Sequence, residues 1–165
     1  MGSEERADTG MISDEAKRII RDFPLGVVAT IAPDGTPAAS PKGTFLVLDD
    51  RTIAYGDIRS PGTRRNLETN PACEVVFVDP FSRKGFRLRG KAEIVSDSKA
   101  KFVELHPKWV ETWGDLAVRV SALVVISVNR ALPLATPPYD DGVTEEEMVA
   151  LYVHKFGAIY PGGDP

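Results

Sequence analysis

Several anion-binding side chains cluster at the expected start of a short helix near the middle of the chain. Ser60 is a favourable N-cap residue and Pro61 suits the first helical position, which places Thr63 and Arg64 in the first turn. A helix start is electropositive and normally prefers acidic residues. Arginine there fits a bound anion such as a phosphate, held by the Arg64 guanidinium and by hydroxyl groups. The alternative interpretation is that Arg64 and Arg65 point into water.

The rest of the chain offers little catalytic or metal-binding chemistry. His106 and His154 lie far apart, without the spacing of a metal site. Cys73 lies in an apolar run and is expected to be a small core residue. The sequence has no nucleophile elbow, no phosphate-binding loop and no dinucleotide-binding glycine motif. We therefore predict no catalytic side chains and no metal ligands.

Two further patterns have a structural and a functional interpretation. Basic residues around one expected strand could bind a phosphorylated ligand, but a solvated sheet face is the favoured interpretation. These residues are Arg83, Lys84, Arg87, Arg89 and Lys91. Trp109 and Trp113 could cover a planar ligand, although packing in the core or at a subunit interface is favoured.

Hydrophobic periodicity predicts the elements that must position these residues. Helices are expected at residues 13–22, 60–68, 97–106 and 144–156, and the last one has a capping box and ends before Gly157. Six strands are expected, at residues 25–31, 38–48, 52–56, 72–78, 85–95 and 117–128. The first strand is apolar and β-branched, which indicates burial on both faces or nearly so. Residues 109–116 are expected to be irregular. Hairpin connections indicate a mainly β fold of the α+β class, an antiparallel barrel or sandwich.

Composition is that of an ordinary globular protein. The chain has 165 residues, 42% of them hydrophobic, and a net charge of −4, so broad attraction to nucleic acid or to an anionic membrane is not expected. One cysteine, no membrane-length apolar run and no signal-peptide pattern predict a cytoplasmic protein. We expect a single domain over residues 12–157, a disordered tail at 1–11 and a loose tail at 158–165.

Several short motifs together resemble the pyridoxamine 5′-phosphate oxidase-like superfamily of FMN-binding split-barrel proteins. They are Gly35-x-Pro37, Ser40-Pro41-Lys42-Gly43, Tyr55-Gly56, Ser60-Pro61-Gly62-Thr63-Arg64-Arg65-Asn66-Leu67, Asn70-Pro71 and the run from Gly85 to Ala92. Their order and spacing, over residues 12–130, carry the resemblance. It implies a six-stranded antiparallel split β-barrel with flanking helices. It also implies a homodimer with FMN bound in clefts between the subunits.

The resemblance further implies which residues bind the cofactor. One group would line the flavin ring, and a second group, at a strand end and a helix start, would hold the ribityl phosphate. The residues are Ser40, Pro41, Lys42, Gly43, Tyr55, Gly56, Asp57, Ser60, Thr63, Arg64 and Asn66. Gly43 and Gly56 would allow close backbone approach, and Trp109 or Trp113 of the second subunit could close the site. Thr63 stands where many relatives have a phosphate-binding lysine, so Arg64 or Lys42 must supply the charge.

The implied function is that of an FMN-dependent oxidoreductase. It would move two electrons, as hydride, between a nicotinamide or other donor and a small organic acceptor. The residues that grip pyridoxal phosphate in true vitamin B6 oxidases are not evident, so pyridoxamine phosphate is not the expected substrate. Other functions stay open on the same barrel: a non-catalytic flavin-binding or storage protein, a deazaflavin-dependent reductase, or a haem-handling protein.

Overall fold

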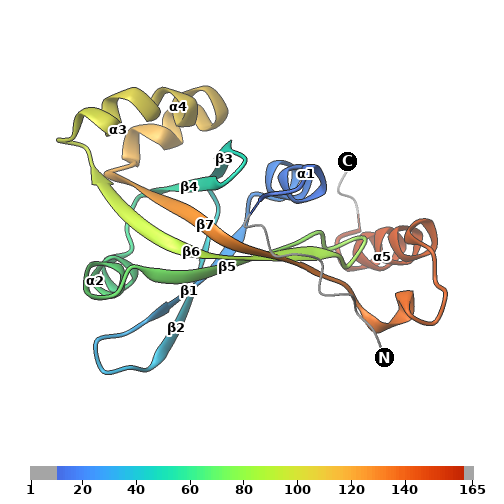
Figure 1. Ribbon diagram of the computed structural model, residues 1–165. Coiled ribbons are helices and arrows are strands. Elements are labelled where there is room, and N and C mark those ends of the chain that lie inside the picture. The colour runs from blue at the N-terminus through green and yellow to red at the C-terminus, as the bar shows by residue number, and fades with distance from the viewer. Residues whose placement is uncertain (1–10, 162–165) are drawn as a thin grey trace.

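The fold is a single antiparallel sheet with helices around it (Figure 1). The computed structural model describes residues 11–161, so most of the expected N-terminal tail and residues 162–165 lie outside the described residues. Within this range seven strands follow the order β2-β1-β5-β6-β7-β4-β3. The strands are β1 (Gly26–Ile31), β2 (Pro37–Lys42), β3 (Phe45–Asp49), β4 (Thr52–Asp57), β5 (Ala72–Val78), β6 (Gly85–Ser96) and β7 (Ala122–Leu134). The mainly β antiparallel class is thereby confirmed.

The expected number of six strands was wrong, because residues 38–48 form two strands. β2 pairs with β1, with Lys42 opposite Gly26, whereas β3 pairs with β4, with Phe45 opposite Tyr55. Gly43 lies in the break between them. Across residues 11–161, β2 and β3 form the two ends of the sheet and do not pair with each other, so the barrel is not closed.

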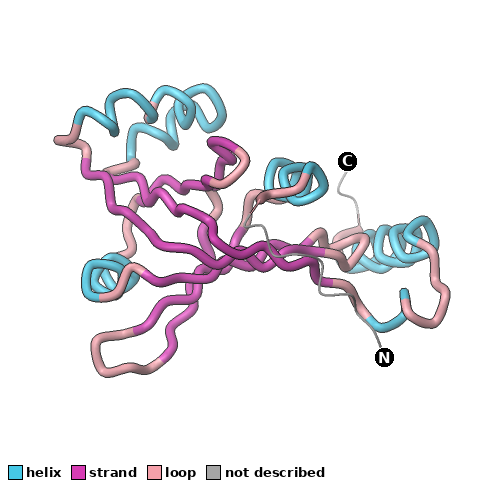
Figure 2. Tube along the Cα trace, viewed as in Figure 1, coloured by secondary structure: helices cyan, strands magenta, loops and turns pink. Residues whose placement is uncertain are grey.

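Helices lie around the twisted sheet (Figure 2). They are α1 (Asp14–Asp22), α2 (Pro61–Thr69), α3 (Ala100–Leu105), α4 (Pro107–Trp113) and α5 (Glu145–Ile159), with 3₁₀ turns η1 (Gly114–Arg119) and η2 (Pro137–Tyr139). Helices α3 and α4 lie at one end of the long strands β6 and β7, and α5 lies at the other (Figure 2). One hydrophobic core joins the buried face of α1 to the inside of the sheet. A second core surrounds Trp109, between α3, α4, η1 and strands β4 and β7.

Three expected boundaries differ from those of the structure. Pro107 was expected to end a helix, but it takes the first position of α4, where a missing N–H costs nothing. The segment expected to be irregular is therefore largely helical, and β7 begins only at Ala122. Gly157 lies inside α5, which ends with Tyr160 as its C-cap. The first part of the expected loose C-terminal tail is thus helical.

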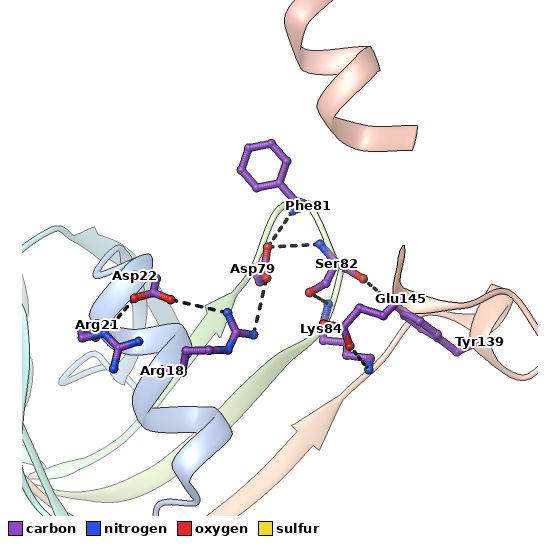
Figure 3. A network of polar contacts seen from close by, with 9 residues as sticks. All are labelled: Arg18, Arg21, Asp22, Asp79, Phe81, Ser82, Lys84, Tyr139 and Glu145. Carbon is purple, nitrogen blue, oxygen red and sulfur yellow. Dashed lines mark hydrogen bonds and ion pairs between the residues drawn. The ribbon is translucent and has the colours of Figure 1, made fainter. Parts of the chain in front are cut away.

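Polar contacts attach both α1 and α5 to the turn between β5 and β6 (Figure 3). Asp79 is buried at the start of this turn, and its carboxylate lies 3.7 Å from an Nη atom of Arg18 on α1. At the other end of the turn, Lys84 donates a hydrogen bond of 2.6 Å to Glu145 at the start of α5. The C-terminal helix is therefore attached to the sheet, at the far end of β6 and β7 from α3 and α4 (Figure 1).

None of the described helices is both long enough and apolar enough to cross a membrane. The cytoplasmic location stays a prediction.

Candidate functional site

A small cavity of about 190 Å³ lies where the chain passes from β2 to β3. Its lining residues come from this break and from the end of β4. They are Pro41, Lys42, Gly43, Thr44, Gly56, Asp57, Ile58 and Arg59. Sequence reasoning identified most of this lining but missed Thr44, Ile58 and Arg59. Arg59 lies between the Tyr55-Gly56 motif and the motif that starts at Ser60, and its positive charge beside a helix start was the available signal.

Thr44 and Gly56 form one wall of the cavity, and residues of the second core hold this wall in place. The Thr44 hydroxyl donates to the Gly56 carbonyl at 2.8 Å, and the Trp109 indole N–H donates to the Thr44 carbonyl at 2.8 Å. A Cβ atom on Gly56 would lie 2.8 Å from a methyl carbon of Val120 and 3.0 Å from the Trp109 ring. Glycine is thus required at position 56 by internal packing. A Cβ atom on Gly43 would meet no atom within 4 Å, so this backbone stays open to a ligand.

Lys42 places an ammonium group at the cavity. Its Nζ donates a hydrogen bond of 2.7 Å to the Ser40 hydroxyl. Partial burial lowers the pKa of Lys42, and the nearby charge of Asp57 opposes this shift. The two predicted residues Ser40 and Lys42 therefore act as one polar pair.

The predicted anion-binding residues at the start of α2 bind a carboxylate of their own chain. Asp57 is 2% exposed and accepts hydrogen bonds from Ser60 Oγ and Arg64 Nε. Arg64 also donates from Nη2 to the Ser121 hydroxyl at 2.5 Å. Ser60 occupies the N-cap position as expected, but its side chain makes no capping bond to the helix backbone. Arg64 therefore neither points freely into water nor carries an uncompensated charge, whereas Arg65 is exposed.

Three other predicted site residues lie in the interior. Asn66 donates from Nδ2 to the Thr30 hydroxyl at 2.9 Å and so joins α2 to β1. Thr63 is buried on the same side of α2. Tyr55 is fully buried in the first core, and its hydroxyl has no hydrogen-bond partner among the described residues. The structure does not place these three side chains on the cavity.

The tryptophans take separate positions. Trp109 is fully buried in its own chain, so it cannot close the site of a second subunit, and the core interpretation is confirmed for it. Trp113 is partly buried and lines a different cavity. The basic residues along β6 agree with a sheet face, since Arg87 and Arg89 both pair with Glu74, at 3.0 and 2.8 Å.

Metal and thiol chemistry find no support in the described part of the chain. No group of three His, Cys, Asp or Glu side chains within residues 11–161 could hold a metal ion. Cys73 is buried, and desolvation raises the pKa of its thiol to about 12. The thiol is therefore protonated at neutral pH and is a poor nucleophile.

The open sheet, the flanking helices and the cavity at the β2–β3 break define a split-barrel type of protein. The sequence model of the family described as pyridoxamine 5′-phosphate oxidase matches residues 12–129. The chain belongs to this family. The match ends within β7, so η2 and α5 lie outside it.

Solved structures agree with this assignment. A histidine-to-alanine variant of HupZ of Group A Streptococcus is 33% identical, over 75% of this chain and 100% of that chain, with a TM-score of 0.65. An F420 reductase is 20% identical, over 73% and 98% of the two chains, with a TM-score of 0.58. An FMN-binding protein of Syntrophomonas wolfei subsp. wolfei is 12% identical, over 74% and 86%, with a TM-score of 0.63. The last two show the fold alone. No curated protein matches the chain.

Proposed function

We propose that this protein is an FMN-dependent oxidoreductase that moves hydride between a nicotinamide or other donor and a small organic acceptor. The observation that supports this most strongly is the cavity at the β2–β3 break. Lys42, Gly43 and Asp57 line it, and the resemblance assigns these positions to the cofactor. When bound, the flavin supplies the two-electron chemistry, so the chain needs only to bind and orient.

The donors around the cavity fit part of such a ligand. Lys42 offers a partly desolvated ammonium group, with Ser40 fixing its position, and the open backbone at Gly43 allows close approach. Arg59 is exposed beside the cavity and carries the positive charge that suits a phosphate. Arg64 is a weaker candidate for the phosphate, because Asp57 already compensates its charge.

We also propose that the functional form is a homodimer with the cofactor between subunits. Small-molecule sites usually measure about 300–1,000 Å³, and the cavity of one protomer, about 190 Å³, encloses less than that. The outer face of β1 is apolar and uncovered: Val27 and Ile31 are each 41% exposed, and Val78 on the neighbouring β5 is 42% exposed. A second protomer would cover such a face and supply the missing wall.

The first test is the absorbance spectrum of freshly purified protein, with mass measurement of the released ligand. The proposal predicts a yellow protein with bound FMN that bleaches anaerobically with NADH or NADPH and then reduces a quinone or dye. Colour without reduction would indicate a storage protein. A deazaflavin or haem in the released material would contradict the FMN assignment.

Variants locate the site. Arg59→Gln should weaken FMN binding by about 1.5–3 kcal/mol, the value of a lost charge-assisted hydrogen bond. Arg65→Gln, an exposed arginine away from the cavity lining, is the matched control and should bind normally. Equal affinity of the two variants would contradict the phosphate assignment.

The dimer is tested by sedimentation. Val27→Glu should yield monomers, since it puts a charge on the apolar face of β1. Val103→Glu changes a valine that is 69% exposed on α3 and should leave the dimer intact. A wild-type monomer that holds FMN tightly would overturn the shared site.

A further inference from the structure

A second and larger cavity, of about 380 Å³, opens between α1, β3 and α4. Its lining consists of Lys17, Ile20, Arg21, Pro24, Phe45, Leu46, Val47, Thr112 and Trp113. It shares no lining residue with the cavity at the β2–β3 break. Its volume falls in the range of small-molecule sites, about 300–1,000 Å³.

The inner surface of this cavity suits a flat apolar group. Ile20 and Phe45 belong to the first core and form a fixed floor, with Val47 packed against it. Trp113 belongs to the edge of the second core and is only partly buried, which leaves part of its indole ring available. Aromatic rings stack favourably on such surfaces and bury a large area.

The charged groups of the lining are all positive. Lys17 and Arg21 lie one helical turn apart on α1, and no acidic residue among residues 11–161 lines the cavity. The Asp50 carboxylate accepts a hydrogen bond of 2.5 Å from Lys17 and raises the pKa of that lysine, so Lys17 stays protonated.

Arg21 is the more available cation. It bonds Asp22 through Nε at 2.9 Å (Figure 3), a contact that leaves its two terminal amino groups for another partner. The Arg21 side chain is 71% exposed. Exposed ion pairs contribute only about 0–1 kcal/mol, so an incoming carboxylate can displace or share this contact at little cost. A guanidinium matches the two oxygens of a carboxylate.

We propose that this cavity binds a flat aromatic carboxylate, with its ring against Trp113 and the Phe45 floor and its carboxylate at Arg21. Charge complementarity selects the anion over a cation of the same shape. The apolar floor selects an aromatic acid over a small one such as acetate. The proposal does not require a bound flavin and is independent of the redox function.

The test is titration of the full chain with 2-naphthoate, followed by calorimetry and by tryptophan fluorescence. One ligand should bind per protomer, and the amine 2-naphthylmethylammonium should bind at least about tenfold more weakly. Arg21→Gln should weaken naphthoate binding about two- to fivefold but leave binding of the neutral alcohol 2-naphthalenemethanol unchanged. Arg119→Gln, which changes an exposed arginine outside the lining, should bind like wild type.

A second pair of variants tests the location. Thr112→Trp places a large ring at the mouth of the cavity and should abolish naphthoate binding. Glu111→Trp changes the exposed neighbour on α4, which does not line the cavity, and should retain it. Equal affinity for the acid and the amine, or normal binding by a folded Thr112→Trp variant, overturns the proposal. A colourless protein that binds naphthoate would contradict the flavin function and support this site.

Discussion

Removal of the Arg64 guanidinium should destabilise the ligand-free protein, apart from any effect on ligand binding. Asp57 is 2% exposed and accepts hydrogen bonds from Arg64 and Ser60. In Arg64→Ala the buried Asp57 carboxylate loses its positive partner. Removing one partner of a buried ion pair costs about 3–5 kcal/mol. The Arg64 side chain is 30% exposed, so water can partly replace it, and we expect the lower value, about 3 kcal/mol.

A second substitution removes the unpaired negative charge of Asp57. Asp57→Asn keeps an oxygen that accepts the Ser60 hydrogen bond but carries no charge. In the Arg64→Ala background it should therefore recover about 1–2 kcal/mol of the loss. In the wild-type background the same change should destabilise, because it leaves the Arg64 guanidinium without its carboxylate. The sign of the Asp57→Asn effect should thus depend on residue 64.

Urea unfolding followed by circular dichroism measures these differences, provided that the slopes of the transitions agree. Arg65→Ala is the control, since it removes an exposed arginine from the adjacent position of α2 and should change the free energy of unfolding by no more than about 0.5 kcal/mol. If Arg64→Ala behaved like Arg65→Ala, the buried pair would not be a structural element, and Arg64 would be free to bind a phosphate after all.

Three further predictions concern the same region. Tyr55→Phe should leave the free energy of unfolding unchanged or raise it by up to about 1 kcal/mol, because the hydroxyl is buried without a hydrogen-bond partner among the described residues. A clear decrease in the free energy of unfolding, measured with urea, would show that the hydroxyl has a partner. Gly56→Ala should cost about 1–3 kcal/mol through its contact with Val120, whereas Gly62→Ala, in open space on α2, should stabilise by up to about 1 kcal/mol in calorimetry. Burial lowers the pKa of Lys42 in the folded protein, so between that pKa and the ordinary value of 10.5 the unfolded chain binds more protons. The free energy of unfolding of the wild type should therefore rise relative to that of Lys42→Met as the pH approaches 10.5. A difference between the two proteins that stays constant with pH would contradict the lowered pKa.

Local patterns predicted most of the sheet, and the errors arose where pairing is non-local. The strands that became β1, β5 and β6 were placed almost to the residue. Residues 38–48 were expected to form one strand. They form two, because the first half pairs with β1 and the second half pairs with β4, which lie in distant parts of the sheet. Pro107 could equally end one helix or begin another; in the structure it begins α4, whose Trp109 packs against Gly56 from a distant part of the chain.

The candidate site was predictable in position but not in charge balance. Lys42, Gly43 and Gly56 come from two neighbouring stretches, and the β3–β4 hairpin brings these stretches together. The Asp57–Arg64 pair also joins near neighbours, but an aspartate at a strand end and an arginine at a helix start each have several possible partners. Ser121, the second partner of Arg64, lies 57 residues further along the chain, where sequence reasoning had no signal.

The apolar face of β1 links the fold to the proposed assembly. The sequence indicated burial on both faces, yet alternate residues of β1 are exposed in the single chain. A strand that is solvated on one side ordinarily carries polar residues there, whereas Val27 and Ile31 each leave 41% of their surface uncovered. Full burial of an aliphatic side chain contributes about 1.5–3 kcal/mol, so the remaining exposed surface of such a face can yield several kcal/mol on association. The proposed dimer would account for this pattern, because a second protomer would cover the exposed face of β1.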